Sequence, residues 1–145
     1  MAQALYYLID VNHQSALLAM KNMAEAVVGK GVVFLQIQNK SETGGIVKYE
    51  VANGRLSRRP NPSELLVGGT GTNYFGVVMS KLAVMMDTQL PSGTFTGFVR
   101  NGEVSYRGGL IYVAKDHIIY TGCSGGPELV DVEIASLGMK KLGIN

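Results

Sequence analysis

The chain has 145 residues, 46% of them apolar and 17% charged, so it can bury one core and disorder is not expected. Thirteen lysines and arginines against eleven aspartates and glutamates leave a net charge of +2, too weak to indicate a nucleic-acid or membrane partner. One cysteine excludes an intrachain disulfide framework, and with two histidines no metal site is expected. Without a recognisable signal peptide or a membrane-length apolar run, the expected setting is reduced and cytoplasmic.

The first segment predicts a long helix. Apolar residues recur at near-helical spacing over residues 3–28. Asn12 and His13 indicate a bend between a short piece and a longer one. Gly29 and Gly31 then predict the end of the helix, because glycine adopts the left-handed conformation common after a helix.

Strands are expected next. Residues 31–38 predict a strand in which Val33, Leu35 and Ile37 face one way and Gln36 and Gln38 the other. Residues 46–52 alternate between apolar and polar side chains and predict a second strand. Asn53-Gly54 predicts a hairpin turn, because both positions tolerate positive φ, and a short return strand is expected over residues 55–58.

The middle of the chain predicts a second helix and a second hairpin. A glycine-rich loop at residues 68–72 leads into an apolar helical stripe over residues 72–88, with Thr72 as its N-cap. An Asn-Gly pair between residues 95–100 and 103–106 predicts two further strands.

The last third predicts two strands and a terminal helix. Residues 110–114 and 117–123 are the strands, and Pro127 suits the first position of the helix. Lys140 and Lys141 fall in its last turn, where the helix dipole favours cations. The order of elements indicates an α+β fold of the profilin-like or Roadblock-like kind. It would have a largely antiparallel sheet of about five strands, a long N-terminal helix, a central helix and a C-terminal helix.

Several short motifs resemble those of a known family. They are the pair Gly108-Gly109, the GCSGG run at residues 122–126, Asp131 and Ala135 on the last helix, and SKLAVMMDTQLPSGTF at residues 80–95. In this combination the chain resembles a divergent member of the GlcG/HbpS-like family. The resemblance implies that residues 1–145 form one small α+β domain that assembles into a homo-oligomer, a dimer or higher. It also implies small-molecule binding, with haem as a precedent.

The GCSGG run allows several interpretations. It matches the G-x-S-x-G elbow of hydrolases, but no histidine follows the serine as that arrangement requires, so we reject this interpretation. The small residues could simply make a tight strand-to-helix connection capped by Ser124. Alternatively, free N–H groups there could hold an anion. The candidate ligand-binding or anion-binding residues are Ser124, Gly125, Gly126, Arg107 and Asp131.

Two other patterns stay open. GGTGT at residues 68–72 is either a flexible loop or an anion cradle, although it lacks the third glycine of a dinucleotide fingerprint and the lysine of a P-loop. Arg55, Arg58 and Arg59 belong either to a solvated hairpin or to a site for an acidic ligand.

The two histidines are the candidate haem ligands. His13 on the first helix and His117 on a late strand could each bind iron through a ring nitrogen. An isolated helical histidine is more often a surface or interface residue, and His117 follows a turn and is expected to be exposed. Cys123 shares a strand with His117 at a separation of about 20 Å, so the two cannot form a catalytic pair within one subunit.

Three functions are therefore compared. The first is a homo-oligomeric domain that binds an apolar ligand with an acidic group, for which haem is the family precedent. The second is a cofactor-independent enzyme acting on a small organic acid, with Glu128 or Asp131 as base. The third is a purely structural oligomer. Neither a nucleic acid nor a membrane is expected as a partner.

Overall fold

The computed structural model describes residues 2–144, and their side chains from residue 12 onward. Its main elements in chain order are α1 (Ala2–Val27), β1 (Val32–Asn39), β2 (Ile46–Val51), a 3-10 turn η1 (Ala52–Gly54), β3 (Ser57–Arg58), α2 (Pro62–Leu66), β4 (Thr72–Asn73), α3 (Tyr74–Thr88), β5 (Gly109–Val113), β6 (His117–Ser124) and α4 (Glu128–Lys141).

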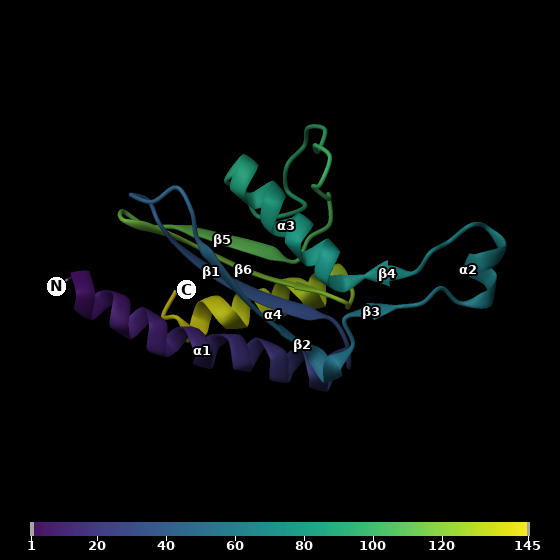
Figure 1. The fold of residues 1–145 in the computed structure, drawn as a ribbon, viewed down its shortest axis with the longest axis horizontal. Coiled ribbons are helices and arrows are strands. Elements are labelled where there is room, and N and C mark those ends of the chain that lie inside the picture. Colours follow the sequence, from purple (N-terminus) through teal and green to yellow (C-terminus); the bar gives the residue numbers. More distant parts are fainter. Residues whose placement is uncertain (1, 145) are drawn as a thin grey trace.

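The centre of the molecule is a four-stranded antiparallel sheet. Its strands lie in the order β2-β1-β6-β5. Helices α1 and α4 cover one face and α3 lies on the other (Figure 1). This arrangement confirms the α+β prediction, with a four-stranded sheet and a separate two-stranded sheet in place of a single one of about five strands.

Side chains alternate between two apolar cores. On β1, Val33 and Leu35 pack toward α1 and α4, whereas Val32 and Phe34 pack toward α3. All four are completely buried, as expected for an inner strand covered on both faces. The alternation predicted for residues 31–38 is confirmed. The residues of β6 alternate in the same way, because each pairs with a residue of β1 that faces the same side of the sheet.

Helix α1 is continuous. It runs through Asn12 and His13 in helical conformation, so the predicted bend is wrong. Its end is confirmed: Gly29 adopts a φ of 83°, and its N–H donates to the carbonyl of Ala24 at 2.8 Å.

The predicted hairpin after β2 is wrong. Asn53 and Gly54 do adopt positive φ, but they form the 3-10 turn η1. The N–H of Ala52 donates to the carbonyl of Gly31, and the carbonyl of Arg55 accepts from the N–H of Gly31, so the chain is drawn toward Gly31 and away from β2. The return strand β3 pairs with β4 instead.

The middle of the chain contains a short helix that periodicity missed. Helix α2 begins after Asn61, whose side-chain oxygen accepts from the N–H of Glu64 at 2.8 Å. The N-cap of α3 is Asn73 and not Thr72, which lies in β4; the Asn73 side chain accepts from the N–H of Gly76. An asparagine at each start is among the preferred N-caps.

The second predicted hairpin is also wrong. Residues 95–106, all of them described, form no strand and lie in a long loop between α3 and β5. The Asn-Gly turn itself is present, with Gly102 at a φ of 89°, and Arg100 in this loop pairs with Asp87 of α3. Among the described residues this segment has no neighbouring strand to pair with, so the predicted strands do not form.

The last third agrees with expectation. Strands β5 and β6 pair in register and α4 ends with Lys140 and Lys141 in its last turn. Pro127 occupies the N-cap position, one residue before the predicted one.

Candidate functional site

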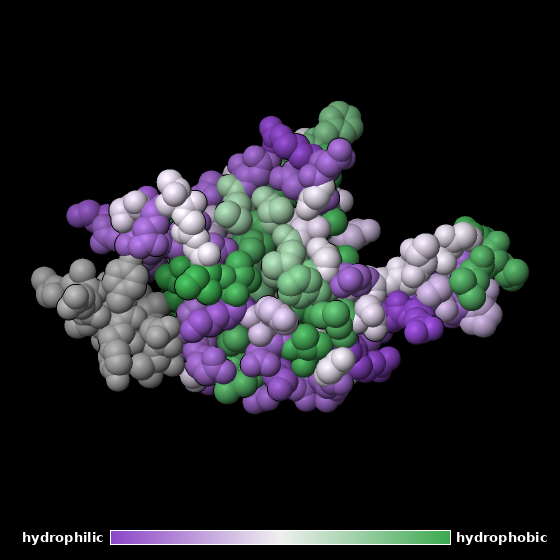
Figure 2. Space-filling model, in the orientation of Figure 1, coloured by the Kyte–Doolittle hydropathy of each residue, from purple (hydrophilic) through white to green (hydrophobic). Residues whose placement is uncertain are grey.

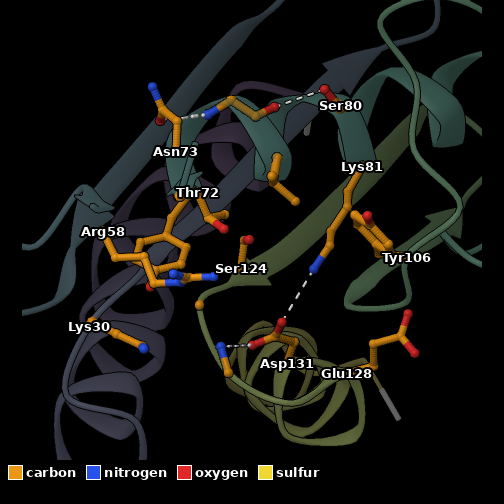
Figure 3. Close-up of a pocket in the computed structure, with 16 residues that line it drawn as sticks. Lys30, Arg58, Thr72, Asn73, Ser80, Lys81, Tyr106, Ser124, Glu128 and Asp131 are labelled. Carbon is orange, nitrogen blue, oxygen red and sulfur yellow. Dashed lines mark hydrogen bonds and ion pairs between the residues drawn. The ribbon is translucent and has the colours of Figure 1, made fainter. Parts of the chain in front are cut away.

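The structure contains a cavity of about 650 Å³ where four segments meet. The segment from Ser57 to Asn73, which we call the arm, forms one wall with its two strands β3 and β4 (Figure 1). The first half of α3 forms a second wall. The end of β6 and the first turn of α4 form the floor, and Tyr106 of the long loop approaches from the side (Figure 3).

A buried ion pair lies at the floor of this cavity. Lys81 descends from α3 and its Nζ donates to the backbone carbonyl of Cys123 at 2.8 Å and to Oδ2 of Asp131 at 3.3 Å (Figure 3). The two side chains are only 2% and 3% exposed. Oδ1 of Asp131 accepts from the N–H of Gly126 at 3.1 Å. Buried charges require such partners, because desolvation without them is costly.

Two glycine contacts give this floor its shape. A Cβ at Gly108 would lie 2.6 Å from Nζ of Lys81 and 2.8 Å from Cβ of Asp131, so only glycine leaves room for the pair. Gly31 and Gly125 cross closely, since a Cβ on Gly125 would lie 2.7 Å from Cα of Gly31. This crossing joins the start of β1 to the turn between β6 and α4.

Burial sets the protonation behaviour of the floor. It raises the pKa of Asp131 above the ordinary carboxyl value, while the ammonium of Lys81 acts in the opposite direction. Burial, together with the negative charge of Asp131, also raises the pKa of the Cys123 thiol, so Cys123 is not a thiolate nucleophile.

The upper walls carry polar groups. The hydroxyl of Tyr74, a residue only 4% exposed, has no hydrogen-bond partner among the described residues. The ammonium of Lys30 lies 5.7 Å from the centre of the Tyr74 ring. Arg58 also lines the cavity, and its Nη1 donates to both carboxylate oxygens of Glu64 at 2.9 and 3.1 Å.

Four of the five predicted binding residues line the cavity: Ser124, Gly125, Gly126 and Asp131. Their arrangement differs from a simple anion-holding turn, because the N–H of Gly126 is already bound to Asp131. Arg107 is the exception. It does not belong to the described lining, and its backbone N–H donates to Oε1 of Glu128, which does.

The structure places both histidines away from this cavity. His13 is buried on α1, on the sheet face opposite α3. His117 is half-buried at the first residue of β6, opposite Asn39, and lies at the other end of the strand from Ser124, roughly 23 Å away. Within the described part of the chain, no three His, Cys, Asp or Glu side chains are grouped as metal ligands.

Motif matching missed the residues at the centre of the site. Lys81 lies within the apolar stripe of α3, between Val78 and Met85. A lysine inside such a stripe is the one feature of the sequence that could have indicated a buried, functional cation. Tyr74 and Lys30 carried no signal, because nothing in the sequence shows that the start of β1 meets the start of α3.

Comparison of the chain with protein-family models, curated proteins and solved structures finds no match. The GlcG/HbpS-like resemblance therefore stays a prediction. Over the described residues, none of the helices combines the length and hydropathy needed to cross a bilayer.

Proposed function

We propose that this protein binds a small organic molecule with an acidic group in the cavity above Lys81 and Asp131. The observation that carries the proposal is the Tyr74 side chain, which lines the same cavity as the buried ion pair and whose hydroxyl is buried without a partner among the described residues. An unsatisfied buried polar group costs about 1–3 kcal/mol. A ligand that bonds to this hydroxyl would offset that cost.

The charge of the lining favours an anionic ligand. Lys81 is paired with Asp131 and Arg58 with Glu64, so the cation of the lining that is best placed to meet an anion is Lys30. The volume of about 650 Å³ falls within the usual range for small-molecule sites, about 300–1,000 Å³. We infer that the acidic group lies near Lys30 and Arg58 and that the remainder of the ligand reaches Tyr74 and Ser124.

Haem with a histidine ligand does not fit this cavity, because the described lining contains no histidine. Bound haem would supply redox or gas-binding chemistry, and its iron needs an axial donor. His13 and His117 remain candidate ligands for haem only at another place on the molecule.

A second candidate function is proton transfer on a small organic acid. The raised pKa of Asp131 beside a cavity is the observation that favours it, since catalytic bases are tuned in this way. Of the two carboxylates considered as base, Glu128 is exposed, whereas Asp131 faces the cavity from a buried position. Loss of turnover with retained ligand binding in Asp131→Asn would distinguish this function from binding alone.

The binding proposal is tested by isothermal titration calorimetry with acetate, pyruvate, succinate, citrate and inorganic phosphate. We expect at least one of them to bind, and Lys30→Gln or Tyr74→Phe to weaken that binding about 5- to 100-fold, the loss of one hydrogen bond to a charged or buried group. Lys115→Gln, on the exposed turn between β5 and β6, is the matched control and should bind normally.

The proposal is wrong if none of these anions binds, or if the control loses as much affinity as the two cavity variants. A parallel absorbance titration with haemin tests the remaining haem prediction. A Soret band shifted by wild type and lost in His13→Ala or His117→Ala would place haem at a histidine, outside the cavity described above.

A further inference from the structure

The arm projects from the body of the molecule along its long axis (Figure 1). Polar contacts order it internally. Asn61 caps α2, the N–H of Gly69 donates to the carbonyl of Glu64 at 2.7 Å, and Arg58 pairs with Glu64. None of the five described residues of α2 is buried. A helix this short has little stability of its own, so a contact from outside the arm would stabilise it further.

The end of the arm is apolar. Leu65, Leu66 and Val67, which we call the arm tip, are 60%, 87% and 86% exposed. Figure 2 shows them as an apolar patch at the far end of the projection. Burying such side chains stabilises by about 1.5–3 kcal/mol each. A cluster of this kind at the end of a projecting segment marks an interaction surface.

The charges around the tip disfavour a membrane. Residues 61–71 contain one charged side chain, Glu64, and it is paired with Arg58. Peripheral membrane segments surround their apolar residues with lysines and arginines that contact anionic headgroups. Residues 61–71 contain no lysine and no arginine, so a neutral apolar protein surface suits the arm tip better than a membrane.

The body offers such a surface. Beside the free edge of β2, the side chains of Val47, Tyr49, Phe75 and Met79 form what we call the apolar band. Tyr49 is 50% exposed and contacts Phe75 edge-to-face, with ring centres 4.9 Å apart. Apolar side chains gather over α3 and the adjoining sheet in Figure 2. Uncovered sheet edges with apolar side chains are normally protected by another element.

We propose that the arm tip docks onto the apolar band of a second copy of this chain, in a reciprocal exchange of arms about a two-fold axis. The arm points away from its own body, so its tip does not reach its own band (Figure 1). In a two-fold dimer each protomer contributes both a tip and a band, so the two contacts are identical and every exposed tip finds a band. A net charge of +2 per chain opposes this association only weakly.

The exchange also completes the cavity. Arg58, Gly71 and Thr72 belong to the base of the arm and line the cavity wall. An arm held by the second copy fixes that wall, whereas a free arm leaves it unsupported. This part of the inference rests on the proposed binding function, but the docking itself does not.

Sedimentation velocity tests the docking. We expect the wild-type protein to sediment as a dimer or a higher even oligomer, and Leu66→Ser with Val67→Ser to sediment as a monomer with an unchanged circular dichroism spectrum. Both substitutions are at exposed positions and do not disturb the core. Leu129→Ser, at a leucine of α4 that is 63% exposed, is the control and should remain oligomeric. A monomeric wild type, or an oligomeric double variant, overturns the proposal.

Cross-linking locates the contact independently of any ligand. Cys123 is buried, so a thiol introduced by Leu66→Cys can be labelled selectively with benzophenone maleimide. After irradiation of mixed ¹⁵N-labelled and unlabelled chains, we expect links between chains to peptides containing Tyr49 or Phe75. Links confined to one chain, or to a different surface, contradict the proposal. Binding of a monomeric wild type to phosphatidylserine vesicles through Leu66 and Val67 would contradict it too.

Discussion

At the scale of single residues, the feature that distinguishes this protein is the ion pair between Lys81 and Asp131. Replacing a buried pair with neutral groups is often harmless, whereas removing one partner leaves an uncompensated charge. The pair is therefore weak evidence for stability by itself. Its position at the cavity floor, with Asp131 also bound to Gly126, explains better why two charges are placed there.

The variant Lys81→Met tests the electrostatics of this pair. We expect it to unfold with a free energy about 3–5 kcal/mol lower than wild type at neutral pH. Burial already raises the pKa of Asp131, and loss of the lysine raises it further. A raised pKa in the folded state means that stability is lost as the pH rises through it, and is recovered as the pH falls toward about 4, the unfolded value.

Urea denaturation between neutral and mildly acid pH measures this effect. The deficit of Lys81→Met should shrink as the pH falls, and adding Asp131→Asn should restore much of the stability while keeping an acceptor for Gly126. Lys115→Met, at an exposed turn, should change stability by less than about 0.5 kcal/mol. A deficit that does not change with pH would mean that Asp131 does not become protonated in the variant.

At the scale of elements, the crossing of Gly31 and Gly125 holds two distant connections together. Gly31 adopts a φ of 112°, and a Cβ there would lie 2.2 Å from the carbonyl oxygen of Ser124. We expect Gly31→Ala to lower the free energy of unfolding by about 1–3 kcal/mol, because both the conformation and the contact become strained.

The control for this prediction is Gly44→Ala. Gly44 lies in the exposed loop before β2, with open space around its Cα, and should change stability by less than about 0.5 kcal/mol. Equal effects of the two substitutions in urea titrations would show that the crossing is not a tight contact in solution.

The elements also show what could be predicted from the sequence. Strand β1 and the pair β5–β6 were predictable, because their alternation reflects burial against covering helices. The pairing of the return strand after Asn53 was not predictable, because hydrogen bonds to Gly31, distant in sequence, draw the chain away from β2 and leave β3 to pair with β4. Likewise, Ser124 and Asp131 were identified locally, whereas Lys81 required knowledge of how α3 crosses the sheet.

At the scale of the whole molecule, the sheet separates two different layers. Helices α1 and α4 cover one face with a continuous core that includes Cys123, while α3 leaves part of the other face to the cavity and the apolar band. The first layer should therefore open only when the protein unfolds globally. Ligand binding and association belong to the second layer, which is the less completely covered one.

The reactivity of Cys123 tests this division. The thiol is 1% exposed and burial raises its pKa, so Ellman's reagent should modify it only after unfolding. We expect the logarithm of the reaction rate to rise with urea with a slope close to that of global unfolding. Ser41→Cys, at an exposed loop position, should react at once and reports reagent activity. Fast reaction of Cys123 without urea would instead show that α4 detaches locally from β6, and the buried pair between Lys81 and Asp131 would then be exposed in the same opening.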